Sequence, residues 1–216
     1  MRKIVLSCLA VTFFSALFYF AALWVGLLGI FLMLVIPFIY YRTHEISPRA
    51  VITEGRPLLP QIVAGLILCI SVMALSLVAV AIIAIYMNIG FLDSLRTYGQ
   101  SPQNIFMAIF VIGFGEEWFF RGFVFDKLHK DTNNKSVAIF VSSLLFGLVH
   151  FNFSLVGDYT VIMLANIVYC IIVGLLLACA RAKLIPGRVM QSASLLSVSI
   201  AHAAYVIFMP IILQNV

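Results

Sequence analysis

Long apolar runs separated by short polar segments make up almost all of this 216-residue sequence. Later in the chain they predict five helices, at about residues 60–88, 103–125, 136–151, 160–180 and 189–213. Most of these are near the roughly 20 residues that cross a bilayer. The first run, Ile4 to Tyr41, is too long for one crossing, and we expect two helices with a tight turn within Trp24–Gly29, because glycine tolerates turn conformations. The pattern therefore predicts about seven transmembrane helices.

The composition agrees with a membrane protein. Hydrophobic residues make up 64% of the chain and charged residues 10%, and the mean hydropathy is +1.16. A soluble domain is roughly half apolar and about a quarter charged, and a soluble core of this size could not hide so much apolar surface. We predict an all-α, polytopic membrane helix bundle that forms one integral membrane domain over residues 1–216. Its amino-terminal helices span about 4–88, and the helices that carry the motifs span about 100–213.

The basic residues follow the gaps between apolar runs and do not gather on one face. Eleven of the thirteen fall in alternate gaps, at Arg2, Lys3, Arg42, Arg49, Arg56, Lys127, Lys130, Lys135, Arg181, Lys183 and Arg188. The positive-inside rule places these gaps and the amino terminus in the cytoplasm. The net charge of +5 thus reflects membrane topology, and we expect a lipid bilayer and no nucleic acid as partner. A cleaved signal peptide is the alternative for the first helix, but no convincing small-x-small cleavage site follows it.

Ionisable side chains inside a membrane are costly and mark functional sites. Helix 103–125 carries Glu116, Glu117 and Arg121, helix 136–151 ends near His150, and helix 189–213 contains His202. Counted from the cytoplasmic ends, Glu116, His150 and His202 lie at depths of roughly 15, 21 and 19 Å, at about 1.5 Å per residue. We therefore expect the carboxylate and both imidazoles to converge on one cavity near the midplane, within about 8 Å of each other.

Helical spacing separates the two glutamates. Glu117 and Arg121 stand at i and i+4, in the favourable order for an ion pair, which would offset much of the cost of burying either charge. Glu116 points about 100° away from Glu117 on an α-helix and has no partner on its own helix. A carboxylate without a partner suits a general base. We therefore expect Glu117 and Arg121 to support a site in which Glu116 works.

Other small or polar residues in the apolar runs have a structural interpretation. Buried polar groups often form hydrogen bonds between membrane helices, and this is also the alternative for each histidine taken alone. The serines lack the sequence context of a nucleophile, and the cysteines lack metal-type spacing. We expect these residues to pack between helices: Ser142, Ser143, Ser194, Ser197, Ser199 and Gly147, with Cys8, Cys69, Cys170 and Cys179 as small buried hydrophobes.

Three features together resemble a known family. Glu-Glu-x-x-x-Arg at 116–121, Phe-x-x-x-His at 146–150 and the later His202 resemble the CPBP family. That family groups the CAAX prenyl-protein endopeptidases with bacteriocin-processing and self-immunity proteins, also called the Abi family. The resemblance covers about residues 100–210, and the two motifs in this order are fairly specific.

The resemblance implies hydrolysis of a peptide bond in a membrane-associated peptide or protein, by an enzyme of the bacterial plasma membrane. Glu116 would activate water. In one version a divalent metal, expected to be zinc, would be held by Glu116, His150 and His202. In the other version no metal is bound, and the two histidines would stabilise the oxyanion directly. The sequence leaves both versions open.

One position departs from the family pattern. Members often carry Asn or Asp four residues after the last histidine, where this chain has Val206. Tyr205, Asn152 and Asn166 are the polar residues that could take its place. Two other functions stay open: a non-catalytic scaffold or self-immunity protein of the same fold, and a proton- or ion-coupled transporter, because Glu and His near the midplane also mark ion pathways.

Overall fold

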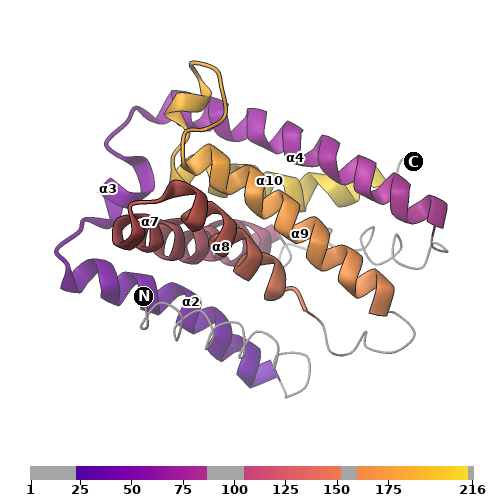
Figure 1. Ribbon diagram of the computed structural model, residues 1–216, viewed down its shortest axis with the longest axis horizontal. Helices are drawn as coiled ribbons and strands as arrows, with labels where there is room; N and C mark the ends of the chain where they lie inside the picture. Colours follow the sequence, from indigo (N-terminus) through magenta and orange to yellow (C-terminus); the bar gives the residue numbers. More distant parts are fainter. Residues whose placement is uncertain (1–22, 87–104, 152–159, 214–216) are drawn as a thin grey trace.

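The computed structural model describes residues 23–86, 105–151 and 160–213, and every regular element within these ranges is a helix (Figure 1). The elements are α2 (Leu23–Thr43), α3 (Pro48–Thr53), α4 (Leu58–Tyr86), η1 (Met107–Glu116), η2 (Trp118–Phe125), α7 (Asp126–Thr132), α8 (Lys135–Leu148), α9 (Thr160–Arg181), η4 (Met190–Ser192) and α10 (Leu195–Leu213). The elements η1, η2 and α7 follow one another as a single long helix. The predicted all-α class is confirmed.

Two of the described helices are long and apolar enough to cross a membrane by length and composition, over Leu58–Ala79 in α4 and Met163–Arg181 in α9. Shorter apolar helices cover Leu28–Thr43, Lys135–Leu148 and Leu195–Met209. Helices suit a bilayer because they bond their own backbone groups. These helices indicate a membrane protein. Seven crossings stay a prediction, since the first predicted helix, from Ile4, lies outside the described residues.

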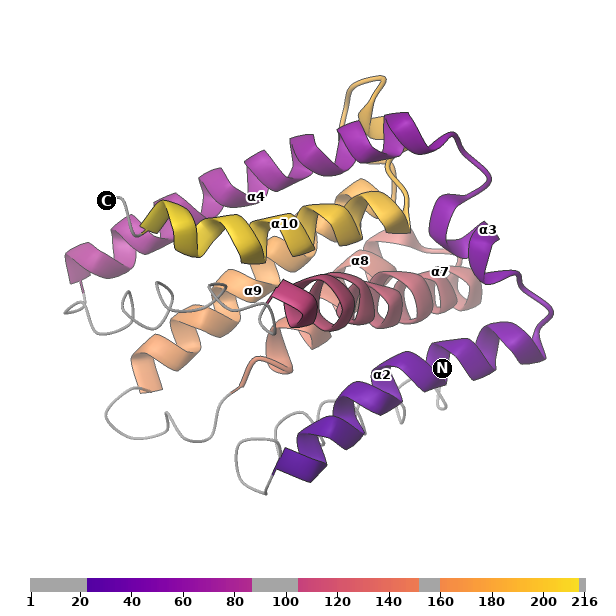
Figure 2. The same cartoon turned by 180° about the vertical axis from the view of Figure 1, so that it is seen from behind.

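Helix α10 lies at the centre of the bundle, between α4 and the long helix that begins with η1 (Figure 2). Helix α8 packs on α9 and η2, and α2 packs on η2. Small residues allow α10 to approach its neighbours closely. A Cβ added to Gly65 would lie 2.9 Å from the carbonyl oxygen of Ser197, and one added to Gly113 would lie 2.8 Å from Cα of Ala203. The neighbour of Ala203 is His202, so this packing brings η1 to a predicted functional residue.

The structure corrects several predicted boundaries. Helix α2 begins at Leu23 and continues through Trp24–Gly29, so the predicted turn in that segment is wrong. Glycine permits a turn but does not impose one, and in a bilayer a continued helix keeps its backbone groups bonded. The last helix begins at Leu195 rather than near residue 189, after the short 3₁₀ turn η4. The short helix α3 has no counterpart in the prediction, because its six residues are too few to show a period.

The long helix also differs in kind from the prediction. The segments η1 and η2 are π-helical, and they meet at Glu117. Apolar periodicity predicts a helix but does not distinguish an α-helix from a π-helix, so the π-helical form could not be predicted from it. Most π-helical turns are short bulges, and they occur frequently at functional sites. The helix also continues beyond the predicted end at Phe125, as α7.

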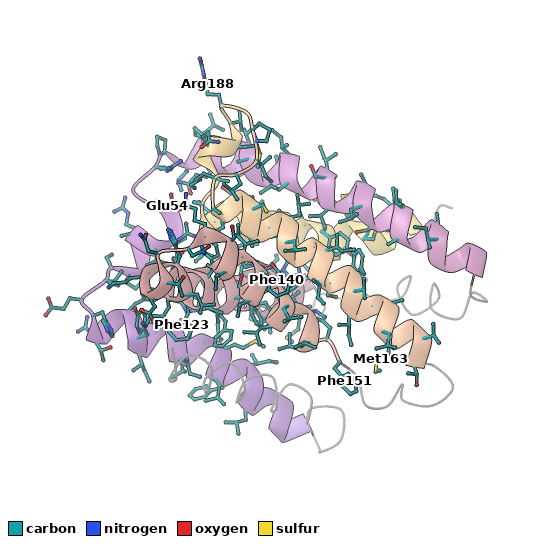
Figure 3. The ribbon with its side chains drawn as sticks, viewed as in Figure 1. Glu54, Phe123, Phe140, Phe151, Met163 and Arg188 are labelled. Carbon is teal, nitrogen blue, oxygen red and sulfur yellow. The ribbon has the colours of Figure 1, made fainter. Side chains whose placement is uncertain are left out.

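The helix ends that carry the basic residues gather at one end of the bundle, where Figure 3 labels Glu54 and Arg188. Arg181, the last residue of α9, forms ion pairs with Glu54 after α3 and with Asp126 at the start of α7. Lys183 Nζ lies 3.2 Å from the same Glu54 carboxylate. These contacts tie α3, α7 and the segment after α9 together. The positive-inside rule predicts that this end faces the cytoplasm.

The close contact at Gly113 predicts a stability change. A Cβ at this position would overlap Cβ of Ala203, so Gly113→Ala should force η1 away from α10 and lower the free energy of unfolding by about 1–3 kcal/mol. Gly115→Ala is the matched control, because its nearest new contact, with Leu34, is an ordinary 3.4 Å. Thermal unfolding of both variants in detergent measures the difference. Equal stability of the two variants would contradict the close packing.

Candidate functional site

Glu117 and Arg121 form the ion pair that their spacing predicted. Arg121 Nη1 donates to Glu117 Oε1 at 2.9 Å, and both side chains are fully buried. Within a bilayer the pairing offsets the cost of burying each charge. The prediction of a same-helix pair is confirmed.

The Arg121 guanidinium also joins two further helices to this pair. Its Nη2 donates to the carbonyl oxygen of Gly174 on α9 at 3.2 Å. Its Cζ lies 4.1 Å from the centre of the Phe146 ring on α8, a distance that allows a cation–π contact. Gly174 also lets α9 approach closely, since an added Cβ would lie 3.2 Å from Ser143 on α8. Arg121 therefore fixes the positions of α8 and α9 relative to η2.

Glu117 has a second partner that the sequence did not reveal. His202 Nδ1 lies 2.9 Å from Glu117 Oε1, the oxygen that also accepts from Arg121. A carboxylate oxygen only accepts, so Nδ1 of His202 carries the proton, and in the neutral ring Nε2 holds a lone pair. Carboxylates orient functional histidines in the same way in many proteins. Glu117 thus positions His202 on α10 from the junction of η1 and η2.

His150 has the same tautomer through a different partner. It lies just beyond the end of α8, and its Nδ1 is 2.8 Å from the carbonyl oxygen of Phe146. The carbonyl accepts, so Nδ1 carries the proton and Nε2 is left for another group. The Phe146 ring contacts both imidazoles, with centroid distances of 5.0 Å to His150 and 5.6 Å to His202. The two predicted histidines therefore lie around one phenyl ring.

Glu116 differs from its neighbour in its partners: each glutamate has a buried Oε2 without one among the described residues, but Glu117 Oε1 accepts from Arg121 and His202. The side chain of Glu116 is half-buried. The carboxyl group interacts electrostatically with His202, Glu117 and Arg121. This agrees with a working carboxylate placed beside a supporting pair. No contact between described residues joins Glu116 to His150, so the convergence of all three side chains on one cavity stays a prediction.

The donor chemistry of Glu116, His150 and His202 suits zinc, which binds imidazole nitrogens and carboxylates. Their arrangement does not suit a metal ion, because within the described ranges no group of three or more His, Cys, Asp or Glu side chains could hold one. As they stand, the three side chains do not form a ready zinc site. Zinc dependence stays a prediction.

Three polar residues were candidates to replace the polar group that is missing at Val206. The Tyr205 hydroxyl is bonded to the hydroxyl of Tyr169 at 2.6 Å. Asn166 lies on α9, half-buried, and Asn152 lies outside the described residues. The position of Val206 itself is half-buried in α10.

The residues expected to pack between helices are mostly buried. All five serines named above are at most 5% exposed, and a Cβ on Gly147 would lie 2.9 Å from the carbonyl oxygen of Ile167. Cys69 and Cys170 are buried and Cys179 is half-buried, whereas Cys8 lies outside the described residues. These observations confirm the packing prediction for the described members.

Comparison with known proteins agrees with the motifs. The model of the family described as Type II CAAX prenyl endopeptidase Rce1-like matches residues 99–208. That range runs from before η1 into α10 and contains Glu116, Glu117, Arg121, His150 and His202. No curated protein and no solved structure matched the chain. The matched range covers half of the chain, and the chain therefore belongs to the Type II CAAX prenyl endopeptidase Rce1-like family.

Proposed function

We propose that this protein is an intramembrane endopeptidase that hydrolyses a peptide bond of a membrane-associated substrate. One observation carries the proposal beyond the family. Glu117 is held by both Arg121 and His202, whereas the adjacent Glu116 forms no ion pair with a described residue and has a buried Oε2 without a partner among them. The two glutamates are thus separated into a positioning group and a reactive group.

In the proposed reaction Glu116 is the general base. Its free carboxylate oxygen takes a proton from water while the water oxygen attacks the scissile carbonyl carbon, giving a tetrahedral intermediate with one negative oxygen. The C–N bond then breaks, and the protonated Glu116 returns the proton to the departing amine. Glu117 is already engaged, because its Oε1 accepts hydrogen bonds from both Arg121 and His202. Its role is to orient His202.

The two imidazoles would act on the reacting group through Nε2. With a lone pair, Nε2 of His150 and of His202 would serve as zinc ligands. Protonated, the same atoms would donate to the negative oxygen and stabilise it. A bound zinc ion would supply a Lewis acid for the carbonyl.

Chelation separates these versions. Because the described side chains form no ready group of three ligands, we expect cleavage to survive 1,10-phenanthroline while His150→Ala and His202→Ala still lose activity. The measurement is the initial rate of cleavage of a farnesylated peptide with a CAAX end, in detergent micelles, with and without chelator. Loss of activity on chelation that added zinc restores would contradict the metal-free version and assign the three side chains to a metal.

A non-catalytic scaffold or self-immunity protein is the second candidate, favoured by the apolar Val206. Such a protein would bind the peptide without cleaving it. We further propose a multi-pass protein of the bacterial plasma membrane with its basic end in the cytoplasm. The charge distribution supports this orientation, and reporter fusions at the carboxyl terminus test it.

A further inference from the structure

The tetrahedral intermediate needs hydrogen-bond donors, and the two histidines lack a free one while they are neutral. The single N–H of each neutral ring is already used, by the Phe146 carbonyl for His150 and by Glu117 for His202. Pre-placed neutral donors are the common means of stabilising an oxyanion. A neutral N–H donor near these rings is therefore the group to search for.

The register of α8 against α9 places Asn166 level with His150. The two helices are antiparallel, and three contacts fix their alignment. Lys135 Nζ bonds the carbonyl oxygen of Ala182, Gly174 packs on Ser143 and Phe146, and Gly147 packs on Ile167 and Ile171. Each step forward along α8 is thus a step back along α9. Continuing from Gly147 to His150 reaches the turn of α9 that contains Asn166. Figure 3 shows Phe151 and Met163, close in sequence to His150 and Asn166, at the same end of the molecule.

Asn166 also belongs to the face of α9 that points into the bundle. The residues at helical spacing from it on this face are almost fully buried, namely Met163, Cys170, Val173 and Leu177. The opposite face carries exposed apolar residues such as Val161, Leu164 and Val168. On the inward face Asn166 is polar and only half-buried, so its amide remains accessible within a buried stripe. A polar group placed there in a membrane helix suggests a functional role.

Cys170 lies beside the amide oxygen of Asn166. Its thiol donates weakly to Asn166 Oδ1 at 3.9 Å and also contacts the imidazole of His150. With Oδ1 turned toward the thiol, Nδ2 and its two N–H groups point to the other side. The hydrogen bond of this side chain to a described residue is the one at Oδ1, and Nδ2 donates to none of them. The amide is thus linked to His150 through one side chain, and its N–H groups are not used by any described residue.

We propose that Asn166 donates a hydrogen bond from Nδ2 to the negative oxygen of the tetrahedral intermediate, beside His150. This inference rests on the proposed protease and adds a substrate-contacting residue to it. An amide donates without first being protonated, so this stabilisation is present whatever the charge of the imidazoles. Val206, four residues after His202 on α10, is apolar and offers no side-chain donor.

The test compares Asn166→Ala and Asn166→Asp with the wild type, by steady-state cleavage of the farnesylated CAAX peptide in micelles. Asp has the size of Asn but lacks the N–H donors. Donation to the oxyanion predicts that both variants lose about 100- to 1,000-fold in kcat with little change in KM. Ser71→Ala is the control, because it removes a polar group from another helix, the exposed hydroxyl on α4 that bonds the carbonyl oxygen of Ile67 in its own helix. Thermal unfolding of all variants checks that they fold.

The outcomes separate this inference from the function on which it rests. Wild-type kcat in Asn166→Asp, or a change confined to KM, overturns the role of Asn166 and leaves the protease intact. Cleavage that persists in Glu116→Gln overturns the proposed function itself. A large loss of kcat in both Asn166 variants, with normal folding and unchanged kcat in Ser71→Ala, supports the inference.

Discussion

Replacing Glu116 by glutamine should lower kcat for peptide cleavage by about 100- to 10,000-fold, because the amide cannot take the proton from water. KM and thermal stability should stay close to those of the wild type. The side chain keeps its size, and its buried Oε2 has no partner among the described residues to lose. Steady-state kinetics on the farnesylated peptide, with unfolding curves of the same preparations, measure both parts of the expectation.

Glu117→Gln is the matched control, with the same chemical change one residue away. It should lower stability as well as activity, because it leaves the buried Arg121 without its counter-charge and His202 without its orienting carboxylate. Equal losses of kcat and equal stability in Glu116→Gln and Glu117→Gln would contradict the division of roles between the two glutamates.

Replacing Arg121 by alanine should destabilise the protein by about 3–5 kcal/mol, since it strands the buried Glu117 carboxylate. The variant also loses the bond to the Gly174 carbonyl and the contact with the Phe146 ring, which hold α8 and α9 on η2. We expect low expression and early thermal unfolding, measured on purified protein in detergent.

The long helix also contains a control for the Arg121→Ala variant. Lys127 and Asp131 form an ion pair of the same i, i+4 spacing in α7, but both side chains are partly exposed. Lys127→Ala should cost at most about 1 kcal/mol, because exposed pairs contribute little. Equal losses in Arg121→Ala and Lys127→Ala would contradict the importance of burial for the Glu117–Arg121 pair.

The sequence predicted those parts of the site that depend on one helix at a time. The Glu117–Arg121 pair follows from helical spacing alone. Hydrophobic runs located most helices to within a few residues, because the bilayer sets their length. The burial of the serines on α8 and α10 also followed from small residues recurring in apolar helices.

Contacts between helices could not be predicted from the sequence. The bond from His202 to Glu117 joins residues 85 positions apart, and it depends on how closely α10 and η1 pack, which Gly113 and Ala203 decide. The π-helical form of η1 and η2 leaves no trace in apolar periodicity. Cys170, expected only as a small buried hydrophobe, contacts His150 because of the α8–α9 register. The sequence does place Cys170 four residues after Asn166, on the same face of the helix, and this spacing was the signal that could have indicated a role for the cysteine.

The most direct measurement of the central claim is cleavage by the purified full chain in liposomes. Wild type and Glu116→Gln are reconstituted with the farnesylated CAAX peptide, and mass spectrometry identifies the products. We expect one new carboxyl terminus, produced by the wild type and absent with Glu116→Gln. The same product from both proteins, or peptide that binds to the wild type and stays intact, would contradict the claim that this protein is a protease whose general base is Glu116.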